Sequence, residues 1–150
     1  MTALRTPHDR PTDVHVTGRR VLSTIVDGLV LGGAYSLLAA GTDSVERVGP
    51  WNWVADTPPA VTVLYALAAA AYFVLMEGAL GQTLGKMVTG IRVVDERTGA
   101  APGYAAAAIR TVLRVVDGIL GYLVAFVVVL SSPRRQRLGD MAAHTLVVRA

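Results

Sequence analysis

The chain has 150 residues, of which 53% are hydrophobic and 17% are charged, and its mean hydropathy is +0.48. A soluble domain usually carries about a quarter charged residues, so this composition indicates a membrane protein. Cysteine is absent, which excludes disulfides, zinc fingers, iron–sulfur clusters and thiol catalysis. The net charge of +3 comes from basic residues that flank long apolar runs without interleaved aromatic residues, which excludes a nucleic-acid-binding surface.

The first apolar run follows a polar start. Residues 1–18 are predicted to form a flexible N-terminal tail, and residues 19–150 a single membrane domain. Residues 21–41 contain one acid, Asp27, in an otherwise uncharged run. About 20 apolar residues suffice for a helix to cross the ~30 Å hydrocarbon core. The acid inside the run and the long segment before it favour an uncleaved transmembrane helix over a cleavable signal peptide.

Asp27 is the most informative residue of this run, because a carboxylate inside the membrane costs roughly 2.5–3.5 kcal/mol and normally faces a partner or a wet cavity. Arg20 precedes it by two helical turns, so the two side chains share one face and are predicted to pair. The pair either fixes helix packing or forms a cation or proton site. Gly28 and Gly32, four residues apart, predict close packing of another helix against this one.

The second apolar run, residues 58–80, predicts a second transmembrane helix that is rich in alanine. Glu77 lies near its end and is therefore predicted to be an interfacial carboxylate. The loop before it, residues 42–57, carries tryptophans suited to the membrane–water interface. The glycines before Lys86 have the wrong spacing for a phosphate-binding loop, so nucleotide binding by that route is excluded.

A strand and an amphipathic helix are predicted in the next part of the chain. Residues 91–94 are typical of a short strand that runs into a turn. Residues 105–117 repeat apolar residues at helical spacing, with Arg110, Arg114 and Asp117 on another face. This pattern predicts a helix that lies at the membrane surface or leads into the membrane.

The third hydrophobic segment allows two arrangements. Residues 118–130 are purely apolar but short, so residues 105–131 either span the membrane or re-enter it. Re-entry, the favoured arrangement, keeps the basic C-terminal tail in the cytoplasm and lets residues 146–148 pair with residues 91–94. The predicted fold is thus all-α and integral to the membrane: a bundle of two transmembrane helices plus a third hydrophobic, spanning or re-entrant segment, with a short cytoplasmic β-pair.

The distribution of basic residues predicts the orientation. Residues 1–20 hold four arginines against two aspartates, and residues 81–114 hold five basic residues against two acids. Residues 42–57 hold one arginine against three acids. Because basic loops favour the cytoplasmic side, the N-terminus and the 81–114 connector are predicted to be cytoplasmic, in the plasma membrane.

Four segments together resemble the RDD family of small multi-pass membrane proteins, which is named for one arginine and two aspartates. They are RRVLSTIVDG, GQTLGKMVTGIRVVDERTG, AIRTVLRVVDGI and RRQRLGDMAAHTLVV, in this order. The resemblance maps the family's arginine to Arg20 and its aspartates to Asp27 and Asp140, while His144 replaces a glycine usual before the threonine. It implies a multi-pass membrane domain, with transport of ions or other ligands proposed for the family and an adaptor role for some members.

Two functions follow from these residues. Transport is the favoured one, with Asp27 and Arg20 forming an ion or proton site. Two or three spans enclose no pathway, so transport requires a homo-oligomer. The alternative is a non-catalytic adaptor or scaffold that contacts other membrane proteins through the glycine and alanine faces.

The remaining candidates surround this trio. The secondary site residues are Asp117, Arg110, Arg114 and Glu77. Asp140 is expected in a solvent-edged basic tail, where it pairs with Arg92 or Arg110 or caps a short helix. The sequence holds no nucleophile–base pair, metal-ligand spacing or phosphate loop, so we expect neither an enzyme nor a cofactor or metal.

Overall fold

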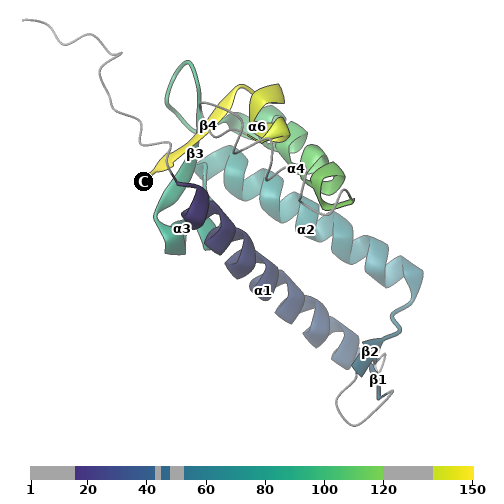
Figure 1. Ribbon diagram of the computed structural model, residues 1–150. Helices are drawn as coiled ribbons and strands as arrows, with labels where there is room; N and C mark the ends of the chain where they lie inside the picture. Colours follow the sequence, from purple (N-terminus) through teal and green to yellow (C-terminus); the bar gives the residue numbers. More distant parts are fainter. Residues whose placement is uncertain (1–15, 43–44, 48–52, 120–136) are drawn as a thin grey trace, which may run out of the picture.

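The computed structural model describes residues 16–42, 45–47, 53–119 and 137–150. The described elements, in chain order, are α1 (Thr17–Gly41), β1 (Val45–Arg47), β2 (Trp53–Ala55), α2 (Pro59–Leu80), α3 (Leu84–Thr89), β3 (Ile91–Asp95), α4 (Gly103–Ile119), α6 (Leu138–Ala142) and β4 (Thr145–Arg149). The helices α1 and α2 run antiparallel and side by side (Figure 1). The hairpin β1–β2 lies at one end of this pair, and α3, β3, α6 and β4 gather at the other.

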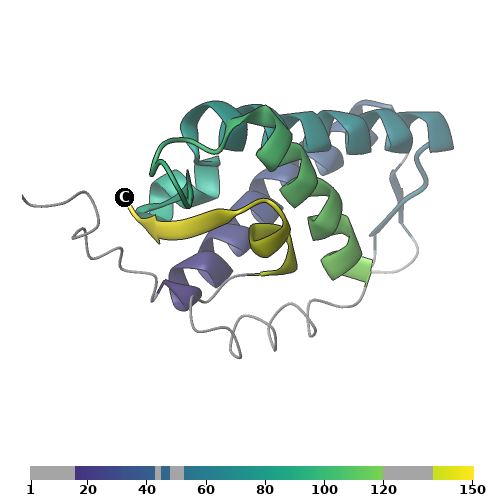
Figure 2. The ribbon, with the colours of Figure 1, turned by 90° about the horizontal axis from the view of Figure 1, so that it is seen from above.

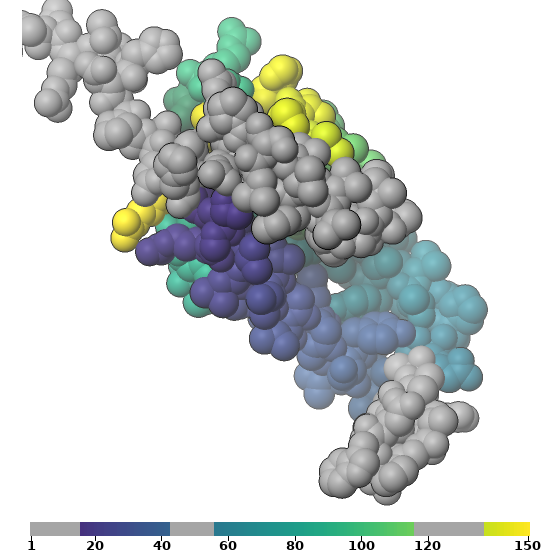
Figure 3. Space-filling view, in the orientation of Figure 1, coloured from purple at the N-terminus to yellow at the C-terminus, as the bar shows by residue number. Residues whose placement is uncertain are grey.

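Among the described residues, two helices, α1 and α2, are long and apolar enough to cross a membrane. Their leucines are exposed, with Leu37 at 77% and Leu64 at 69% of the maximal exposed area. Figure 3 shows one side of the molecule, on which the green and yellow elements do not cover the lower parts of α1 and α2. Apolar surface in water costs about 25 cal/mol per Å², so lipid is the surrounding in which this exposure is stable.

Aromatic side chains join α1 to α2. The hydroxyl of Tyr65 donates to the carbonyl oxygen of Leu31, and the rings of Tyr35 and Tyr65 lie 5.0 Å apart. Gly28 and Gly32 have no atom within 4 Å of the position that a Cβ would take, counting the described part of the chain. The predicted close packing therefore does not occur there within the described residues, because the tyrosines join the two helices elsewhere.

The predicted strand pair is confirmed. β3 and β4 are antiparallel, with Val94 opposite Leu146. Ile91, Val93 and Val147 form a small buried core with Val16, the residue before α1. This core holds the C-terminal strand at the same end of the helix pair as the start of α1.

The end of α2 requires glycine. Gly81 has φ +69°, and a Cβ there would overlap the carbonyl oxygen of Val93. The backbone N–H of Val93 donates to the carbonyl oxygen of Gly81 at 2.7 Å. The turn after α2 is thereby joined directly to β3.

The predicted amphipathic helix is confirmed as α4, which packs along α2. Gly78 permits this contact, because a Cβ there would come within 3.0 Å of the Tyr104 Cα. The short helix α6 lies between the start of α1 and α4 (Figure 2). Most of the third hydrophobic segment, residues 120–136, lies outside the described residues, as does the tail up to residue 15.

Candidate functional site

Charged side chains meet at one end of the molecule, which we call the charged end. It comprises α3, β3, α4, α6 and β4, with residues 17–27 of α1 and residues 72–80 of α2. There Asp140 of α6 forms ion pairs with Arg20 of α1, at 2.7 Å, and with Arg110 of α4. Asp140 also accepts the backbone N–H of Arg137 at 3.0 Å, which caps the first turn of α6. One carboxylate thus connects the first helix to two segments far along the chain.

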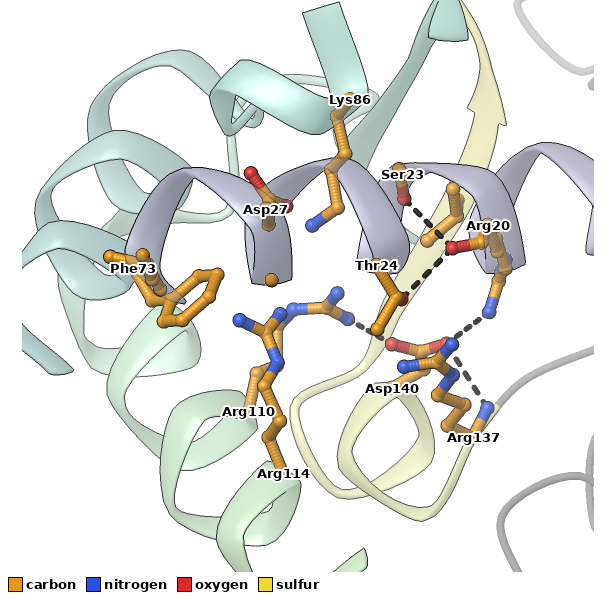
Figure 4. A pocket seen from close by; sticks show the side chains of 13 residues that line it. Arg20, Ser23, Thr24, Asp27, Phe73, Lys86, Arg110, Arg114, Arg137 and Asp140 are labelled. Atoms are coloured by element: carbon orange, nitrogen blue, oxygen red, sulfur yellow. Dashed lines mark hydrogen bonds and ion pairs between the residues drawn. The ribbon is translucent and has the colours of Figure 1, made fainter. Parts of the chain in front are cut away.

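The predicted pair of Arg20 with Asp27 is wrong. Figure 4 shows Arg20 directed toward Asp140, with Asp27 on another turn of α1. Arg20 and Asp27 were expected to pair because they share a face of α1. Arg20 pairs with Asp140 instead, because α6 places Asp140 beside the first turns of α1. Asp140 is only 2% exposed, so its predicted solvent-edged position is wrong. Its pairing with Arg110 and its capping role are confirmed, and the other predicted partner, Arg92, is exposed.

Asp27 instead fixes α3 against α1. Its carboxylate accepts hydrogen bonds from the Thr83 hydroxyl at 2.6 Å, the Gly85 backbone N–H at 2.8 Å and the Tyr72 hydroxyl at 3.2 Å. Thr83 is the N-cap of α3, where a negative charge is favourable. A Cβ on Gly85 would overlap the carbonyl oxygen of Ser23, so only glycine permits this approach.

Glu77 gathers three cations around one carboxylate. Its oxygens lie 2.6 Å from Lys86 Nζ, 2.9 Å from Arg110 Nε and 2.6 Å from Arg114 Nη2. The Arg114 guanidinium also lies 3.9 Å from the centre of the Phe73 ring. Glu77 is 0% exposed. The prediction of an interfacial carboxylate is therefore wrong, because α3 and α4 supply basic side chains that enclose the end of α2.

Arg110 joins the two carboxylates into one network. Its Nε donates to Glu77, and its Nη1 donates to Asp140 and, at 2.7 Å, to the hydroxyl of Thr145. Removing one member of such a buried pair typically costs about 3–5 kcal/mol, because the other charge is left without compensation. Arg110 therefore couples α2, α4, α6 and β4 through a single side chain.

Burial and charge shift the pKa values of this network in opposite ways. Burial alone would raise the pKa of Asp140, but the neighbouring guanidinium groups of Arg110 and Arg20 hold it below its usual range. Burial lowers the pKa of Lys86 to about 7, because the attraction of Glu77 only partly offsets burial and the nearby arginines. Asp140 is therefore ionised at neutral pH, whereas Lys86 is only partly protonated.

A cavity of about 230 Å³ opens within this network. Its lining comprises Arg20, Ser23, Thr24, Asp27, Gly28, Leu31, Phe73, Lys86, Arg110, Arg114, Arg137, Asp140 and Val147. Figure 4 shows Arg20 and Asp140 at one end and Phe73 at the other, with the guanidinium groups of Arg110 and Arg114 between them. The cavity is thus charged at one end and apolar at the other.

Comparison with known proteins gives the family. The model of the RDD family matches residues 15–144. This chain belongs to the RDD family. A relative in Bacillus subtilis (strain 168), described as the uncharacterized membrane protein YteJ, is 32% identical over 130 residues, which cover 86% of this chain and 77% of that protein. No solved structure matches. The family, the relative and the two apolar helices together make this RDD chain a membrane protein.

Most of the predicted site residues of this RDD protein come together. The cluster contains Arg20, Asp140, Glu77, Arg110 and Arg114. Asp27 lines the same cavity but bonds to α3, and the side chain of Asp117 lies outside the described residues. Sequence reasoning missed Lys86 and the helix that Thr83 caps. A threonine three residues before Lys86 is a helix-start signal that could have revealed both.

Proposed function

We propose that this RDD protein is a multi-pass protein of the plasma membrane that serves as a non-catalytic adaptor, binding helices of other membrane proteins. The observation that carries this proposal is the open small-residue face of α1. Gly28, Gly32 and Gly33 meet no atom within 4 Å among the described residues. In lipid, small residues let helix backbones approach closely, which is the main source of affinity between helices there.

Alanines of α2 offer a second small-residue face. Ala68 and Ala71, three residues apart, are exposed on one side of α2, and none of the 18-residue apolar window of α2 is buried. If α1 and α2 contacted no helix of another protein, lipid would cover most of their surface. Two small-residue faces therefore support the binding of a partner's helices within the membrane.

The state of the three buried acids also favours an adaptor over cation transport. Each of them is held by donors or cations from its own chain: three donors at Asp27, three cations at Glu77 and two cations at Asp140. A cation relay needs a carboxylate that exchanges its partners during transport. Three buried basic side chains, Arg20, Lys86 and Arg110, would in addition repel an incoming cation.

The orientation we propose has the charged end in the cytoplasm. Basic residues predominate in the chain segments on that side, and β4 pairs with β3 next to the start of α1. Both long helices then span the bilayer, and β1–β2 lies outside. This arrangement follows the preference of basic loops for the cytoplasmic side.

One observation favours transport as a second candidate. The cavity of about 230 Å³ is lined by Asp27, and ionisable groups beside cavities in membrane helices often handle ions or protons. In this case the carboxylate charge itself is essential, and a homo-oligomer supplies the pathway that two helices cannot enclose.

A single purification distinguishes the adaptor function from the transport function. The tagged full-length chain is extracted in gentle detergent and its mass is measured, alongside the variants Gly28→Leu/Gly32→Leu and Ala34→Leu. Ala34 lies on the opposite face of α1 and makes a matched control for added bulk. We expect a stoichiometric second membrane protein that the glycine variant loses and the alanine variant keeps. A pure homo-oligomer, with ion flux in vesicles that Asp27→Asn abolishes, would instead establish transport.

A further inference from the structure

The cavity at the charged end contains hydrogen-bond donors without acceptors. Nε and Nη2 of Arg20 and Nη1 of Arg114 are buried, and no acceptor among the described residues bonds to them. Arg20 is 4% exposed, so water does not reach these groups freely. A buried donor without a partner costs about 1–3 kcal/mol, and more when it is charged. Both side chains line the cavity, which makes an occupant with acceptor oxygens the natural complement.

Basic side chains outnumber acidic ones around the cavity. Of the side chains that the structure describes in the lining, five are basic, namely Arg20, Lys86, Arg110, Arg114 and Arg137. Asp27 and Asp140 are the acids in that lining, and Glu77 forms an ion pair with Lys86. An excess of positive charge in a partly dehydrated cluster is stabilised by an anion.

The side chains that line the cavity and its depth in the membrane favour a phosphate group as the anion. Planar guanidinium groups match the oxygens of phosphate, to which arginine binds with paired hydrogen bonds. Leu31 and Phe73 add apolar lining, and Figure 4 shows Phe73 at the end away from Arg20. The 25 residues of α1 extend about 37 Å against a core of ~30 Å, so Arg20 in its first turns lies at the depth of lipid headgroups.

We propose that this cavity binds a phosphate group, with Arg20 and Arg114 donating to its oxygens. An anionic phospholipid supplies this group when its acyl chain follows Leu31 and Phe73, and free phosphate supplies it when only the charged end is filled. Basic pockets beside membrane helices bind lipid headgroups by this chemistry. The inference does not depend on the adaptor role, because it rests on the unpartnered donors of Arg20 and Arg114 and not on the glycines of α1.

The test uses the full-length protein in nanodiscs of phosphatidylcholine, with phosphatidylglycerol or inorganic phosphate added. Arg20→Lys retains the charge that faces Asp140 but removes the unpartnered guanidinium donors. Arg114→Gln removes the other donor and leaves Glu77 with Lys86 and Arg110. Arg92→Gln is the matched control, since Arg92 is exposed and does not line the cavity. Native mass spectrometry counts retained lipid, and thermal unfolding reports stabilisation by either ligand.

We expect the parent protein to retain one phosphatidylglycerol per chain in preference to phosphatidylcholine. Retention falls at least about ten-fold in Arg20→Lys and in Arg114→Gln, as expected for loss of a charge-assisted hydrogen bond, and Arg92→Gln behaves as the parent. Stabilisation by inorganic phosphate alone, lost in the same two variants, would identify free phosphate as the source. Equal retention in all four proteins, or no effect of either ligand on the parent, would overturn the proposal.

Discussion

The long helices and the charged end follow opposite rules of burial. Along α1 and α2 the exposed side chains are leucines and valines, and small residues lie open on the surface. At the charged end charged side chains are buried beside the small apolar core of β3 and β4, namely Glu77, Asp140, Arg20, Arg110 and Lys86. The apolar side chains of the long helices therefore contact their surroundings, whereas the charged side chains at the charged end contact one another.

This difference identifies what holds each region together. In lipid the hydrophobic effect gives α1 no reason to prefer α2, because the acyl chains are as apolar as leucine. Directional contacts at the charged end do that work: Asp27 holds α3, Arg110 bridges two carboxylates, and Asp140 holds the start of α1. These contacts and the tyrosines between the helices hold α1 and α2, and within the described residues the glycine face of α1 remains open for other contacts.

The largest expected effect concerns the two ends of the long helices, which we expect on opposite sides of the membrane. The sequence has no cysteine, so single cysteines at Thr42 and Ala150, both exposed, can be labelled without background. An impermeant maleimide applied to intact cells is expected to label Thr42→Cys and to leave Ala150→Cys unlabelled. Both variants should be labelled after permeabilisation. Efficient labelling of Ala150→Cys in intact cells would refute the cytoplasmic charged end.

The next largest effect is expected inside the charged end, at Glu77. Glu77→Gln removes the charge that faces three cations, two of them buried, and is expected to destabilise the protein by about 3–5 kcal/mol. Yield of folded protein and the midpoint of thermal unfolding in detergent measure this loss. Asp56→Asn removes an equal charge from an exposed position near the other end of α2 and should have little effect. Equal stability of the two variants would mean that the network does not hold the fold.

The sequence predicted what depends on neighbours along the chain. Hydropathy located both long helices within four residues of their ends, and alternation located the strands that pair as β3 and β4. It failed for Arg20 because the residue that competes for its charge, Asp140, lies 120 positions away. It failed for Glu77 because hydropathy gives the depth of a residue but not the helices that later enclose it.

A smaller effect is expected at the glycines, where Gly85 lies against the backbone of α1 and Gly28 meets no described atom. Gly85→Ala places a methyl group against the backbone of α1 and is expected to cost about 1–3 kcal/mol, as overpacking usually does. Gly28→Ala meets no described atom, and alanine favours a helix by up to about 1 kcal/mol, so this variant should lose no stability. Thermal unfolding of the two purified variants compares them directly. A larger loss for Gly28→Ala would show that the α1 face is already packed.

The smallest effect is a dependence of stability on pH that originates at the charged end. Burial lowers the pKa of Lys86 to about 7, below its ordinary value of 10.5. Between these values the unfolded chain holds more protons than the folded one, so stability rises with pH through this window and is lost as pH falls toward 7. Averaged over pH 6.5 to 7.5, Lys86 is deprotonated in about half of the folded molecules. The free energy of unfolding therefore rises by roughly 0.7 kcal/mol across this interval.

Lys86→Met isolates this contribution. Methionine has a similar length and no charge, and Glu77 keeps Arg110 and Arg114 as partners, so the variant should fold. The unfolding midpoint of the parent in detergent is expected to rise over this pH interval relative to that of Lys86→Met, because both proteins share every other titrating group. Parallel curves would mean that Lys86 keeps its ordinary pKa and that Glu77 compensates its burial completely. In that case Lys86 would be fully instead of partly charged at neutral pH, and an anion would stabilise the charged end more strongly.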